Sequence, residues 1–314
     1  MSTIWVVGSL NVDLVVGVDR FPEPGETLRG NSFSTFLGGK GGNQAVAVAR
    51  LGAHPRMVGR LGSDQFGRRY REALDALGAR TDLIGEDPDQ PTGTALIEVD
   101  ARGQNRIVIV PGANGTMDET STLAALADLA PGDLVLLQLE IPLATVWKVI
   151  EFAHDRGAVV ILDPAPAAEI PPETLRLVTW ITPNESEAAM ITGTARRETV
   201  TKRETDDALK SAARRLLESG VDNALVKAGP RGAYLATREQ PDPVHLPGFS
   251  VDVVDTTAAG DAFNGGLAWA LSRGAAPQEA VRTANAVGAL AVTGPGAQTA
   301  MPHADAVAEL LHVR

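Results

Sequence analysis

The chain has 314 residues, 44% of them hydrophobic and 4% aromatic, and its 39 acidic residues outnumber 28 basic ones to give a net charge of −11. This length allows one large domain or two smaller ones, and the acidic balance with few aromatics argues against nucleic acid or an anionic membrane as a partner. The lack of cysteine excludes disulfides and thiolate chemistry, and the five histidines show no metal-ligand spacing.

Along the chain, predicted strands alternate with predicted helices. Strands are expected where short apolar runs lie between turn signals, and helices where apolar residues recur every three or four positions. The predicted strands are residues 4–7, 14–18, 94–99, 104–110, 134–137, 158–162, 178–181, 224–227 and 233–235. The predicted helices are residues 45–52, 118–129, 143–156, 204–219 and 278–293, with another that begins near residue 260.

This order predicts an α/β fold, in which a mostly parallel sheet carries helices on both faces as a three-layer αβα sandwich. Ligands of such sheets bind beyond the carboxyl ends of the strands. Two parts do not fit the alternation, a β-hairpin within residues 92–112 and an extended stretch over 13–36. Because no Pro/Gly/Ser-rich linker separates them, we expect a small β element appended to a single domain, 1–314.

Nothing in the sequence directs the chain elsewhere. The residues before the first apolar run are too few and wrongly flanked for a signal peptide, and no apolar run approaches the length of a membrane span. We therefore expect a cytoplasmic protein.

A first glycine cluster, Gly38-Gly39-Lys40-Gly41-Gly42-Asn43-Gln44, precedes a short helical pattern that Gly52 closes. Four glycines in five residues let the backbone approach a ligand closely, and Asn43 offers the donors and acceptors that suit a polyol. The segment is not a Walker loop, because Ser34 and Gly41 stand where that motif needs Gly and Ser or Thr. A dinucleotide fingerprint, G-x-G-x-x-G, is also absent.

A second cluster of small residues, 255–266, changes into a helix near Gly260 or Asp261. The first N–H groups of a helix have no partners within it, and its dipole is positive at that end, so an anion is attracted there. Small side chains at 258–260 leave the amides accessible, and a carboxylate at the same point is placed to take a proton from a group that attacks the anion. This geometry suits phosphoryl transfer. The alternative is that Asp261 is merely the N-cap after a tight turn.

These two clusters carry a resemblance to a known family. Gly-Gly-Lys-Gly-Gly-Asn-Gln-Ala at 38–45 and Asp-Thr-Thr-Ala-Ala-Gly-Asp-Ala-Phe-Asn-Gly at 255–265 are similar to the two signatures of the ribokinase-like (PfkB) sugar kinases. Segments 8–13, 182–187 and 229–232 also fit, in the family's order. The resemblance covers nearly the whole chain and implies the family's αβα fold, with the β element serving as a lid over the sugar.

The resemblance implies ATP-dependent phosphorylation of a primary hydroxyl. Asp261 matches the catalytic base, and the amides of Ala259 and Gly260 match the groups that bind the transferring phosphoryl oxygens. The family often has Gly where this chain has Ala258, which leaves the amide intact unless φ must be positive.

The sugar would be bound by residues at the first glycine cluster and at two predicted strand ends. Asp13 would accept hydrogen bonds from two adjacent hydroxyls; the alternative is an Asx turn that leaves the strand. Glu140 is either a sugar ligand or a solvated loop acid. The full set is Asn11, Asp13, Gly39, Lys40, Asn43, Glu140 and Asp261.

The nucleotide would be bound by a second set, Asn184, Lys227, Gly229, Arg231, Gly232, Gly260 and Asn285. Lys227 departs from the family's small or hydroxyl residue, and it either reaches a phosphate or is solvated. Glu187 would order the water shell of Mg²⁺, although an acid in a first helical turn is also an ordinary dipole complement.

A monovalent cation and a second subunit are also implied. K⁺ would lie in an oxygen cage formed by Asp255, Thr257, Ala291, Gly294 and Gly296; the alternative is that Asp255 caps a turn and the glycines close a helix. The exposed edges of the predicted hairpin would pair with a second copy of the lid to form a homodimer.

The residues and the resemblance together predict an ATP-dependent sugar kinase, with D-ribose as the first candidate substrate and D-ribose 5-phosphate as its product. Deoxyribose, fructose and adenosine are alternatives within the family. A sugar-binding regulator without turnover is a further alternative, but a pure binder has no use for a base at Asp261. A dehydrogenase is excluded by the missing fingerprint.

Overall fold

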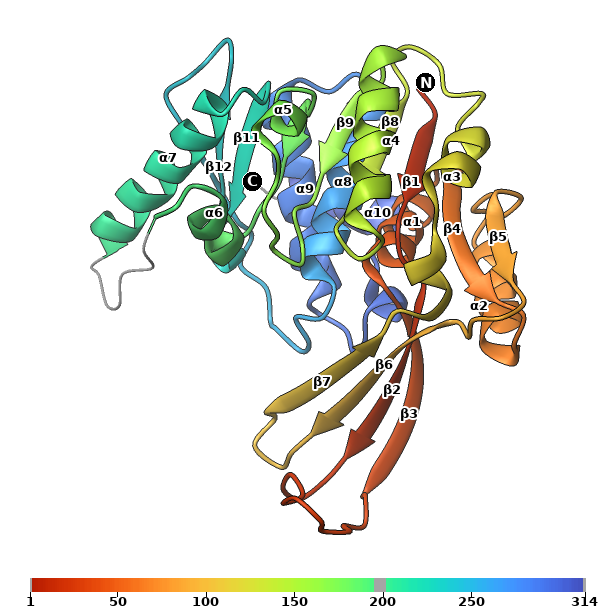
Figure 1. Ribbon diagram of the computed structural model, residues 1–314. Helices are drawn as coiled ribbons and strands as arrows, with labels where there is room; N and C mark the ends of the chain where they lie inside the picture. Colours follow the sequence, from red (N-terminus) through yellow and green to blue (C-terminus); the bar gives the residue numbers. More distant parts are fainter. Residues whose placement is uncertain (1, 195–201, 313–314) are drawn as a thin grey trace.

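The structure, a computed structural model, describes residues 2–194 and 202–312 (Figure 1). Within them a large sheet has the strand order β13-β12-β11-β10-β9-β8-β1-β4-β5. Its strands are β1 (Ile4–Val7), β4 (Arg56–Gly62), β5 (Ile84–Asp87), β8 (Leu134–Leu137), β9 (Val159–Leu162), β10 (Trp180–Ile181), β11 (Asn223–Lys227), β12 (Gly232–Thr237) and β13 (Val244–Pro247). Pairing is parallel from β11 through to β5, whereas β12 and β13 are antiparallel additions at one edge.

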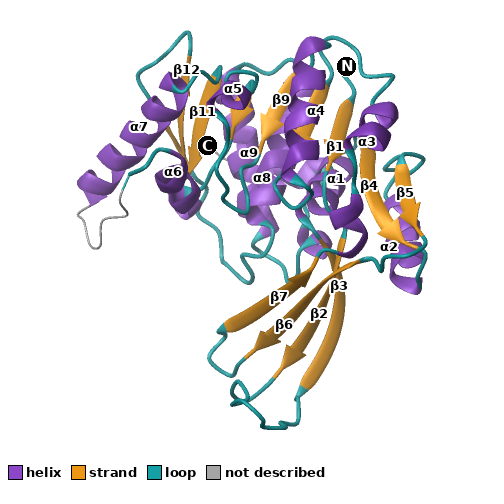
Figure 2. Cartoon of the chain, viewed as in Figure 1, coloured by secondary structure: helices purple, strands orange, loops and turns teal. Residues whose placement is uncertain are grey.

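Helices cover both faces of this sheet, as Figure 2 shows. Their bounds are α1 (Lys40–Arg50), α2 (Gln65–Ala76), α3 (Glu119–Ala125), α4 (Leu143–Asp155), α5 (Pro172–Leu175), α6 (Glu185–Ile191), α7 (Lys202–Glu218), α8 (Ala259–Ser272), α9 (Pro277–Ala291) and α10 (Ala304–His312). Short 3₁₀ turns lie at Gly112–Thr116, Gly229–Arg231 and Gln298–Ala300.

The two faces of the sheet bury two separate cores because side chains alternate along each strand. Val6 and Leu136 pack with α1, α2, α8, α9 and α10, whereas Val7 and Leu137 pack with α4, α5, α6 and α7. The expected three-layer αβα fold is confirmed. The strands predicted at Ile4–Val7 and Leu134–Leu137 have the predicted bounds.

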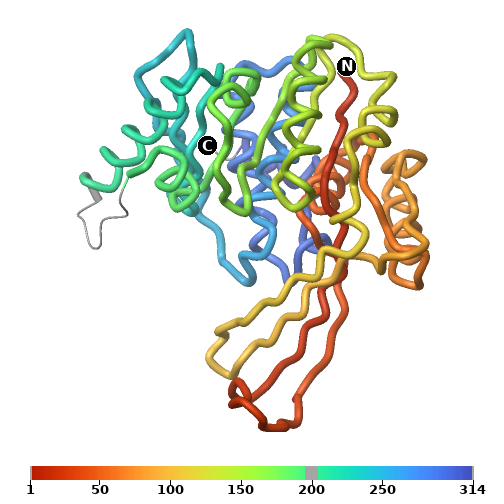
Figure 3. The backbone as a smooth tube through the Cα atoms, viewed as in Figure 1, coloured from red at the N-terminus to blue at the C-terminus, as the bar shows by residue number. Residues whose placement is uncertain are grey.

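A second, four-stranded sheet projects from one end of the main body, as the backbone trace makes plain (Figure 3). Its order is β3-β2-β6-β7, formed by β2 (Asn11–Gly17), β3 (Ser32–Gly38), β6 (Gly93–Val99) and β7 (Asn105–Val110). The predicted hairpin is therefore present as β6 and β7. Because β2 continues the chain almost directly from β1, the small sheet begins at the carboxyl edge of the large one.

Several predicted bounds are wrong. The helix expected over 118–129 ends at Ala125, and the strand expected over 178–181 is only Trp180–Ile181. The helix expected over 45–52 begins five residues earlier, at Lys40. Gly41 and Gly42 belong to this helix. A Cβ on Gly41 would lie 2.6 Å from the carbonyl carbon of Gly8, so the helix needs glycine where it packs beside the end of β1. Close packing against β1 thus outweighs the poor helix propensity of glycine.

No element was predicted between residues 56 and 87, where the structure has β4, α2 and β5. Their polar residues interrupt the apolar patterns. Arg56 and Arg60 lie in β4, and α2 buries little more than Tyr70 and Leu74. The Tyr70 hydroxyl is nevertheless important locally, since it donates to the carbonyl of Gly38 and accepts from Gln298.

Candidate active site

The two glycine clusters meet at the carboxyl edge of the large sheet. Helices α1 and α8 pack so closely that a Cβ on Gly265 would lie 2.5 Å from the Cβ of Ala47. This approach needs glycine on α8, and it brings the first turn of α1 beside the first turn of α8. Residues far apart in the sequence, Asn43 and Asp261, are thereby in contact.

Asp261 is the third residue of α8, and its side chain is buried. Its Oδ2 accepts from Asn43 Nδ2 at 2.9 Å, and its Oδ1 accepts from Gln44 Nε2 at 3.2 Å. The alternative that Asp261 is the helix N-cap is wrong: Ala258 occupies that position, and no side chain caps the helix there. The carboxylate faces the first glycine cluster instead.

The charge state of Asp261 suits a base. Burial raises the pKa of Asp261 to about 6; the Lys40 ammonium opposes this rise and the Asp163 carboxylate adds to it. At neutral pH the group is therefore ionised and still has appreciable proton affinity, as a general base requires. The same carboxylates act on Lys40. Burial by itself lowers the pKa of its ammonium, but Asp261, Asp163 and Glu140 outweigh that effect and hold the pKa above its ordinary value.

The turn before α8 presents backbone amides at the helix N-terminus. Ala258 is in the left-handed region with φ of 59°, the one non-glycine residue with positive φ among those the structure describes. The turn thus requires a positive φ at residue 258. Ala258 is strained in this conformation, and glycine would not be. The amide of Ala259 makes a long hydrogen bond, 3.3 Å, to the carbonyl of Thr256. Gly260 follows as the next helical residue.

Asp13 and Glu140 lie together on the opposite side of the site. Burial, followed by the charge of Glu140, raises the pKa of Asp13 to about 6. A Cβ on Gly38 would lie 2.4 Å from Asp13 Oδ2, so glycine is required beside this carboxylate. Glu140 Oε2 accepts from Ser9 Oγ at 2.5 Å and from the amide of Lys40 at 3.0 Å. Both expected acids are therefore held within the site.

Asn11 and Gly39 complete this side. Asn11 is buried, and its Oδ1 accepts from Asn114 Nδ2 at 2.8 Å, so its own amide group remains the available donor. Gly39 has φ of 81°, and a Cβ there would lie 2.6 Å from the amide nitrogen of Asn11. Asn43 accepts from Gln298 Nε2 through Oδ1 and donates to Asp261. It therefore orients the carboxylate of Asp261.

A cavity of about 560 Å³ opens beside the start of α8. Several residues expected to bind the nucleotide line it, together with a few apolar side chains; these expected residues are Lys227, Gly229, Gly232, Gly260 and Asn285. Asn285 Nδ2 donates to the carbonyls of Leu246 and Pro247 and so fixes one wall. Arg231 is not among the lining residues, and its guanidinium pairs with Glu185 at 2.6 Å.

Lys227 is largely buried, with 13% of its side chain exposed, and its Nζ lies 2.9 Å from Asp163 Oδ1. The alternative of a solvated lysine is wrong. Asp163, which directly follows β9, was not identified from the sequence. Glu140, which was identified, lies in the same way shortly after β8. The same signal, a carboxylate at the end of a buried strand, would have found Asp163.

Asn184 and Glu187 form a capping box at the start of α6. Glu187 accepts from the Asn184 amide and from Asn184 Nδ2, each at 2.8 Å, and its own amide donates to Asn184 Oδ1. The helix-capping role is therefore present. The pKa of Glu187 is nevertheless raised, chiefly by burial, and the nearby charge of Lys227 opposes this. Neither residue lines the 560 Å³ cavity, but Asn184 pairs with Lys227, which does.

Asp255 joins the turn before α8 to the turn after α9. Its Oδ1 accepts from the amide and the hydroxyl of Thr257, and its Oδ2 accepts from the amide of Gly296 at 2.9 Å. Ala291 is the last residue of α9, where helical carbonyls lack partners within the helix. Across residues 2–194 and 202–312, no group of three or more His, Asp or Glu side chains is arranged to hold a metal.

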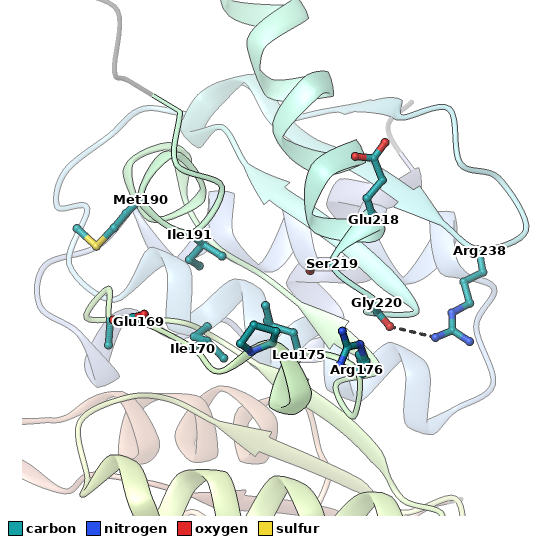
Figure 4. A pocket seen from close by; sticks show the side chains of 12 residues that line it. Glu169, Ile170, Leu175, Arg176, Met190, Ile191, Glu218, Ser219, Gly220 and Arg238 are labelled. Carbon is teal, nitrogen blue, oxygen red and sulfur yellow. Dashed lines mark hydrogen bonds between the residues drawn. The ribbon is translucent and has the colours of Figure 1, made fainter.

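A larger hollow, about 750 Å³, lies elsewhere, between α5, α6 and the end of α7. Figure 4 shows Met190, Leu175 and Arg238 on its walls, with Arg238 bonded to the carbonyl of Gly220. None of the residues expected to carry chemistry lines it, so size alone does not identify the active site. In the part of the chain described, no helix is both long and apolar enough to cross a bilayer.

Comparison with known proteins identifies the family of the chain. Residues 1–304 match the family described as pfkB family carbohydrate kinase. The chain is 40% identical over 311 residues to a ribokinase from Bacillus subtilis, covering 99% of this chain and 100% of that protein. It is 36% identical over 309 residues to a deoxyribokinase from Salmonella typhi, covering 98% of each. A ribokinase structure from Arabidopsis thaliana, complexed with ribose and ATP, superposes with a TM-score of 0.88 at 34% identity and covers 99% of both chains.

Proposed function

Because the chain belongs to the pfkB family of carbohydrate kinases, we propose that it transfers the terminal phosphoryl group of ATP to the 5-hydroxyl of D-ribose, giving D-ribose 5-phosphate and ADP. The observation that carries this proposal is Asp261, a buried carboxylate beside the first amides of α8, with a cavity lined by the expected nucleotide residues on one side and polar strand-end residues on the other. The similarity to ribokinases, one of them solved with ribose and ATP, supports it.

In the proposed reaction, the ribose 5-oxygen attacks the terminal phosphorus of ATP as its proton passes to Asp261. A new oxygen–phosphorus bond forms while the bond to the leaving ADP oxygen breaks. The amides of Ala259 and Gly260 stabilise negative charge on the transferring oxygens, because they lie at the positive end of α8. Positioning and charge stabilisation supply most of the rate, since phosphoryl transfer needs little covalent help from protein groups.

The sugar is held, in this proposal, by the polar groups around the first glycine cluster. Asp13 accepts from two neighbouring hydroxyls, and Asn11 and Lys40 donate. Gly39 lets the sugar approach the backbone, because a side chain there has no room. Glu140 keeps one oxygen for the sugar, since Ser9 and the Lys40 amide both bond its Oε2. The small sheet belongs to the same single domain, 1–314, and serves as a lid, formed near residues 13–36 and 92–112.

ATP would occupy the 560 Å³ cavity, with Gly229 and Gly232 on one wall and Asn285 on another. Asn184 and Arg231 would lie at its margin. Mg²⁺ would supply charge neutralisation between the phosphates, held through water by Glu187. The donor set fits that indirect role: both carboxylate oxygens of Glu187 already accept from Asn184, and Mg²⁺ commonly keeps several waters.

K⁺ is the second cation in the proposal. The carbonyls of Ala291, Gly294 and Gly296, with Asp255 and Thr257, would form an oxygen-rich cage of modest charge, which suits a large monovalent ion better than Mg²⁺. Asp255 already ties the two turns together. K⁺ would therefore stiffen the turn that presents the Ala259 and Gly260 amides, and kcat should be higher in K⁺ than in Na⁺ or Tris at matched ionic strength. An Asp255→Ala variant should lose that difference; equal wild-type rates in all three buffers would overturn this cation role.

A homodimer through the lid is proposed on the exposed hydrophobic surface of the small sheet. Phe33 and Val108 are more than 60% exposed, at 65% and 61%, and lie on β3 and β7, the two edge strands. Exposed apolar edge strands tend to pair with further strands. A second copy of the same sheet would cover them with two-fold symmetry.

A second candidate substrate is 2-deoxyribose, because the chain is nearly as similar to a deoxyribokinase as to ribokinases. The two sugars share the 5-hydroxyl and differ by one hydroxyl, which a site built to bond it distinguishes strongly. The polar set around Asp13 and Asn11 therefore favours ribose.

A coupled assay of ADP release with ribose, 2-deoxyribose, fructose and adenosine tests the proposal. The highest kcat/KM should belong to ribose, and phosphorus NMR should place the phosphate on the 5-oxygen. The matched control is 5-deoxyribose, which keeps the ring hydroxyls but lacks the acceptor, and it should inhibit without being phosphorylated. A higher kcat/KM for another substrate would replace ribose, and ADP release with none of them would leave a binding protein.

A further inference from the structure

A buried ion pair lies at the carboxyl edge of the large sheet. Asp163 directly follows β9 and Lys227 ends β11, and β10 lies between these strands. The two side chains therefore meet across the end of β10, with Lys227 Nζ 2.9 Å from Asp163 Oδ1 and both side chains mostly buried. Removing two charges from water is costly, and a pair of this kind is often no more stabilising than apolar packing. Its position is thus more informative than its stability.

The second oxygen of Asp163 connects the pair to the base. Gln44 Nε2 donates to Asp163 Oδ2 and to Asp261 Oδ1, each at 3.2 Å. Gln138 Nε2 donates to Gln44 Oε1 at 2.7 Å, which fixes the amide of Gln44 with its two protons toward the two carboxylates. The neutral amide of Gln44 thereby holds the carboxylates of Asp163 and Asp261 in a fixed relation. The ammonium of Lys227 pairs with Asp163.

The ammonium of Lys227 lies at the turn that presents the helix amides. A Cβ built on Gly260 would lie 3.4 Å from Lys227 Nζ, and Lys227 lines the same cavity as Ala259 and Gly260. An ammonium has three donors, and Asp163 is bonded to one of them. The others can reach an anion that binds the amides of the turn.

We propose that Lys227 binds the terminal phosphate of the donor nucleotide during transfer, and that Asp163 is the positioning residue that holds Lys227 and, through Gln44, the base Asp261 in register. This inference rests on the proposed phosphoryl transfer and adds a fixed cation to it. A charge so placed stabilises oxygens that become more negative as the phosphoryl group moves, and Asp163 prevents the lysine from swinging onto Asp261 itself.

The assignment predicts selectivity for the third phosphate. Replacing Lys227 by Met removes the ammonium at similar length. Affinity for the non-hydrolysable triphosphate AMP-PNP should fall by about tenfold or more, as expected when a charge-assisted hydrogen bond is lost, while ADP affinity stays within about twofold. Lys227→Arg should restore much of the AMP-PNP affinity. Lys148→Met, which removes an exposed lysine on α4, is the matched charge control and should change neither.

The role of Asp163 is tested by a double-mutant cycle. Asp163→Asn alone should lower kcat by about tenfold and leave the KM for sugar close to unchanged, because it releases Lys227 without touching substrate. Since Lys227→Met leaves a buried carboxylate unpaired and can destabilise the fold, the double variant Asp163→Asn/Lys227→Met removes both charges together. It should keep the low AMP-PNP affinity, and its loss of kcat should be smaller than the product of the two single losses.

The outcomes separate this inference from the proposed function. Equal losses of AMP-PNP and ADP affinity in both the single Lys227→Met and the double variant would place Lys227 at an inner phosphate and overturn the assignment. Strictly additive effects on kcat would remove Asp163 as its positioning residue. A wild-type protein that phosphorylates none of the sugars would overturn the proposed function, whereas the AMP-PNP to ADP affinity ratio would still test Lys227.

Discussion

The polar groups at the carboxyl edge of the large sheet are buried and bonded to one another, whereas the small sheet exposes hydrophobic residues on a single layer. Asn43, Gln44, Asp163 and Asp261 are each exposed by 6% or less, and each has a hydrogen-bond partner. On the small sheet, by contrast, Ile107 is 51% exposed and Val108 is 61% exposed. One region bonds many of its polar groups within the chain, and the other leaves apolar groups uncovered.

This difference indicates how the two regions work. A bonded, buried network holds its geometry before any ligand arrives, which is what electrostatic stabilisation of a transition state requires. Among the described residues the small sheet has no second layer. Under the proposed function, ligand would cover one face and another copy of the chain the other. Chemistry should therefore fail when the network is changed, and assembly or sugar capture should fail when the small sheet is changed.

The largest effect should come from the network. Asp261→Asn keeps the size of the side chain but cannot accept the hydroxyl proton, so kcat should fall by roughly a hundredfold or more, the usual contribution of a positioned base. The affinities for sugar and ATP should change little. Rapid-mix and steady-state kinetics on a variant with wild-type circular dichroism would check this. A kcat near that of wild type would remove Asp261 from the role of base.

Asp13 lies where the two regions join, on β2 of the small sheet but facing the site. Asp13→Ala should raise the KM for ribose by about tenfold or more and leave the KM for ATP unchanged, because a site built around hydroxyls loses affinity when one partner is removed. Equal changes in both KM values would assign Asp13 to structure and weaken the distinction between the two regions.

The pH profile gives a third measurement of the network. Burial raises the pKa of Asp261 and of Asp13 to about 6, so both are ionised above that pH and become protonated below it. The charges that face Asp261 are Lys40, Asp163 and Glu140. Protonation removes the base, so kcat should fall by about tenfold per unit as the pH drops below about 6. In Asp261→Asn the residual kcat should lose this acid limb; a limb that persists there belongs to another group.

The strands next to the site were more predictable than the contacts within it. Ile4–Val7 and Leu134–Leu137 are continuous apolar runs between turn signals, and such runs identify buried parallel strands directly. Three polar residues of the network were missed, Asp163, Gln138 and Asn114. Each bonds a partner about a hundred residues away in the sequence, which no local pattern reveals. The start of α1 was misplaced because tertiary contact at Gly41, which no local pattern records, favours helix there.

The sequence predicted where functional residues lie better than it predicted their contacts. The motif at 255–265 predicted a helix start with a carboxylate, and the structure places Asp261 there, but not as a cap. The sequence left Lys227 between phosphate and solvent, and the distance to Asp163 decides against solvent. Side-chain pairing across non-adjacent strands cannot be deduced from the periodicity of either strand.

A change on the small sheet should affect assembly without reaching the chemistry. Val108 lies opposite Leu96 on the face away from Asp13, as the pairing register shows. Val108→Arg should convert a dimer into a monomer at micromolar concentration, measured by light scattering, because a charge would be buried in an apolar contact. The kcat should stay within about threefold. A monomeric mass for the wild type would contradict the proposed dimer, and a dimeric variant would move the interface elsewhere.

The smallest expected effect is on the free energy of unfolding. It tests whether the turn before α8 keeps a strained backbone conformation at Ala258. Ala258 has a positive φ of 59° at the start of α8, a conformation that costs an L-residue roughly 1–2 kcal/mol and glycine little. Glycine also gains entropy in the unfolded chain, which offsets part of this, so Ala258→Gly should raise the free energy of unfolding by about 0.5 kcal/mol. Ala124→Gly, at an exposed position in the last turn of α3, is the matched control and should lower it by about 0.5–1 kcal/mol. Urea denaturation of both variants gives the sign. A loss at Ala258 as large as that at Ala124 would mean that the turn relaxes to negative φ in solution, and the fixed amide geometry on which the network depends would then need a ligand or cation to form.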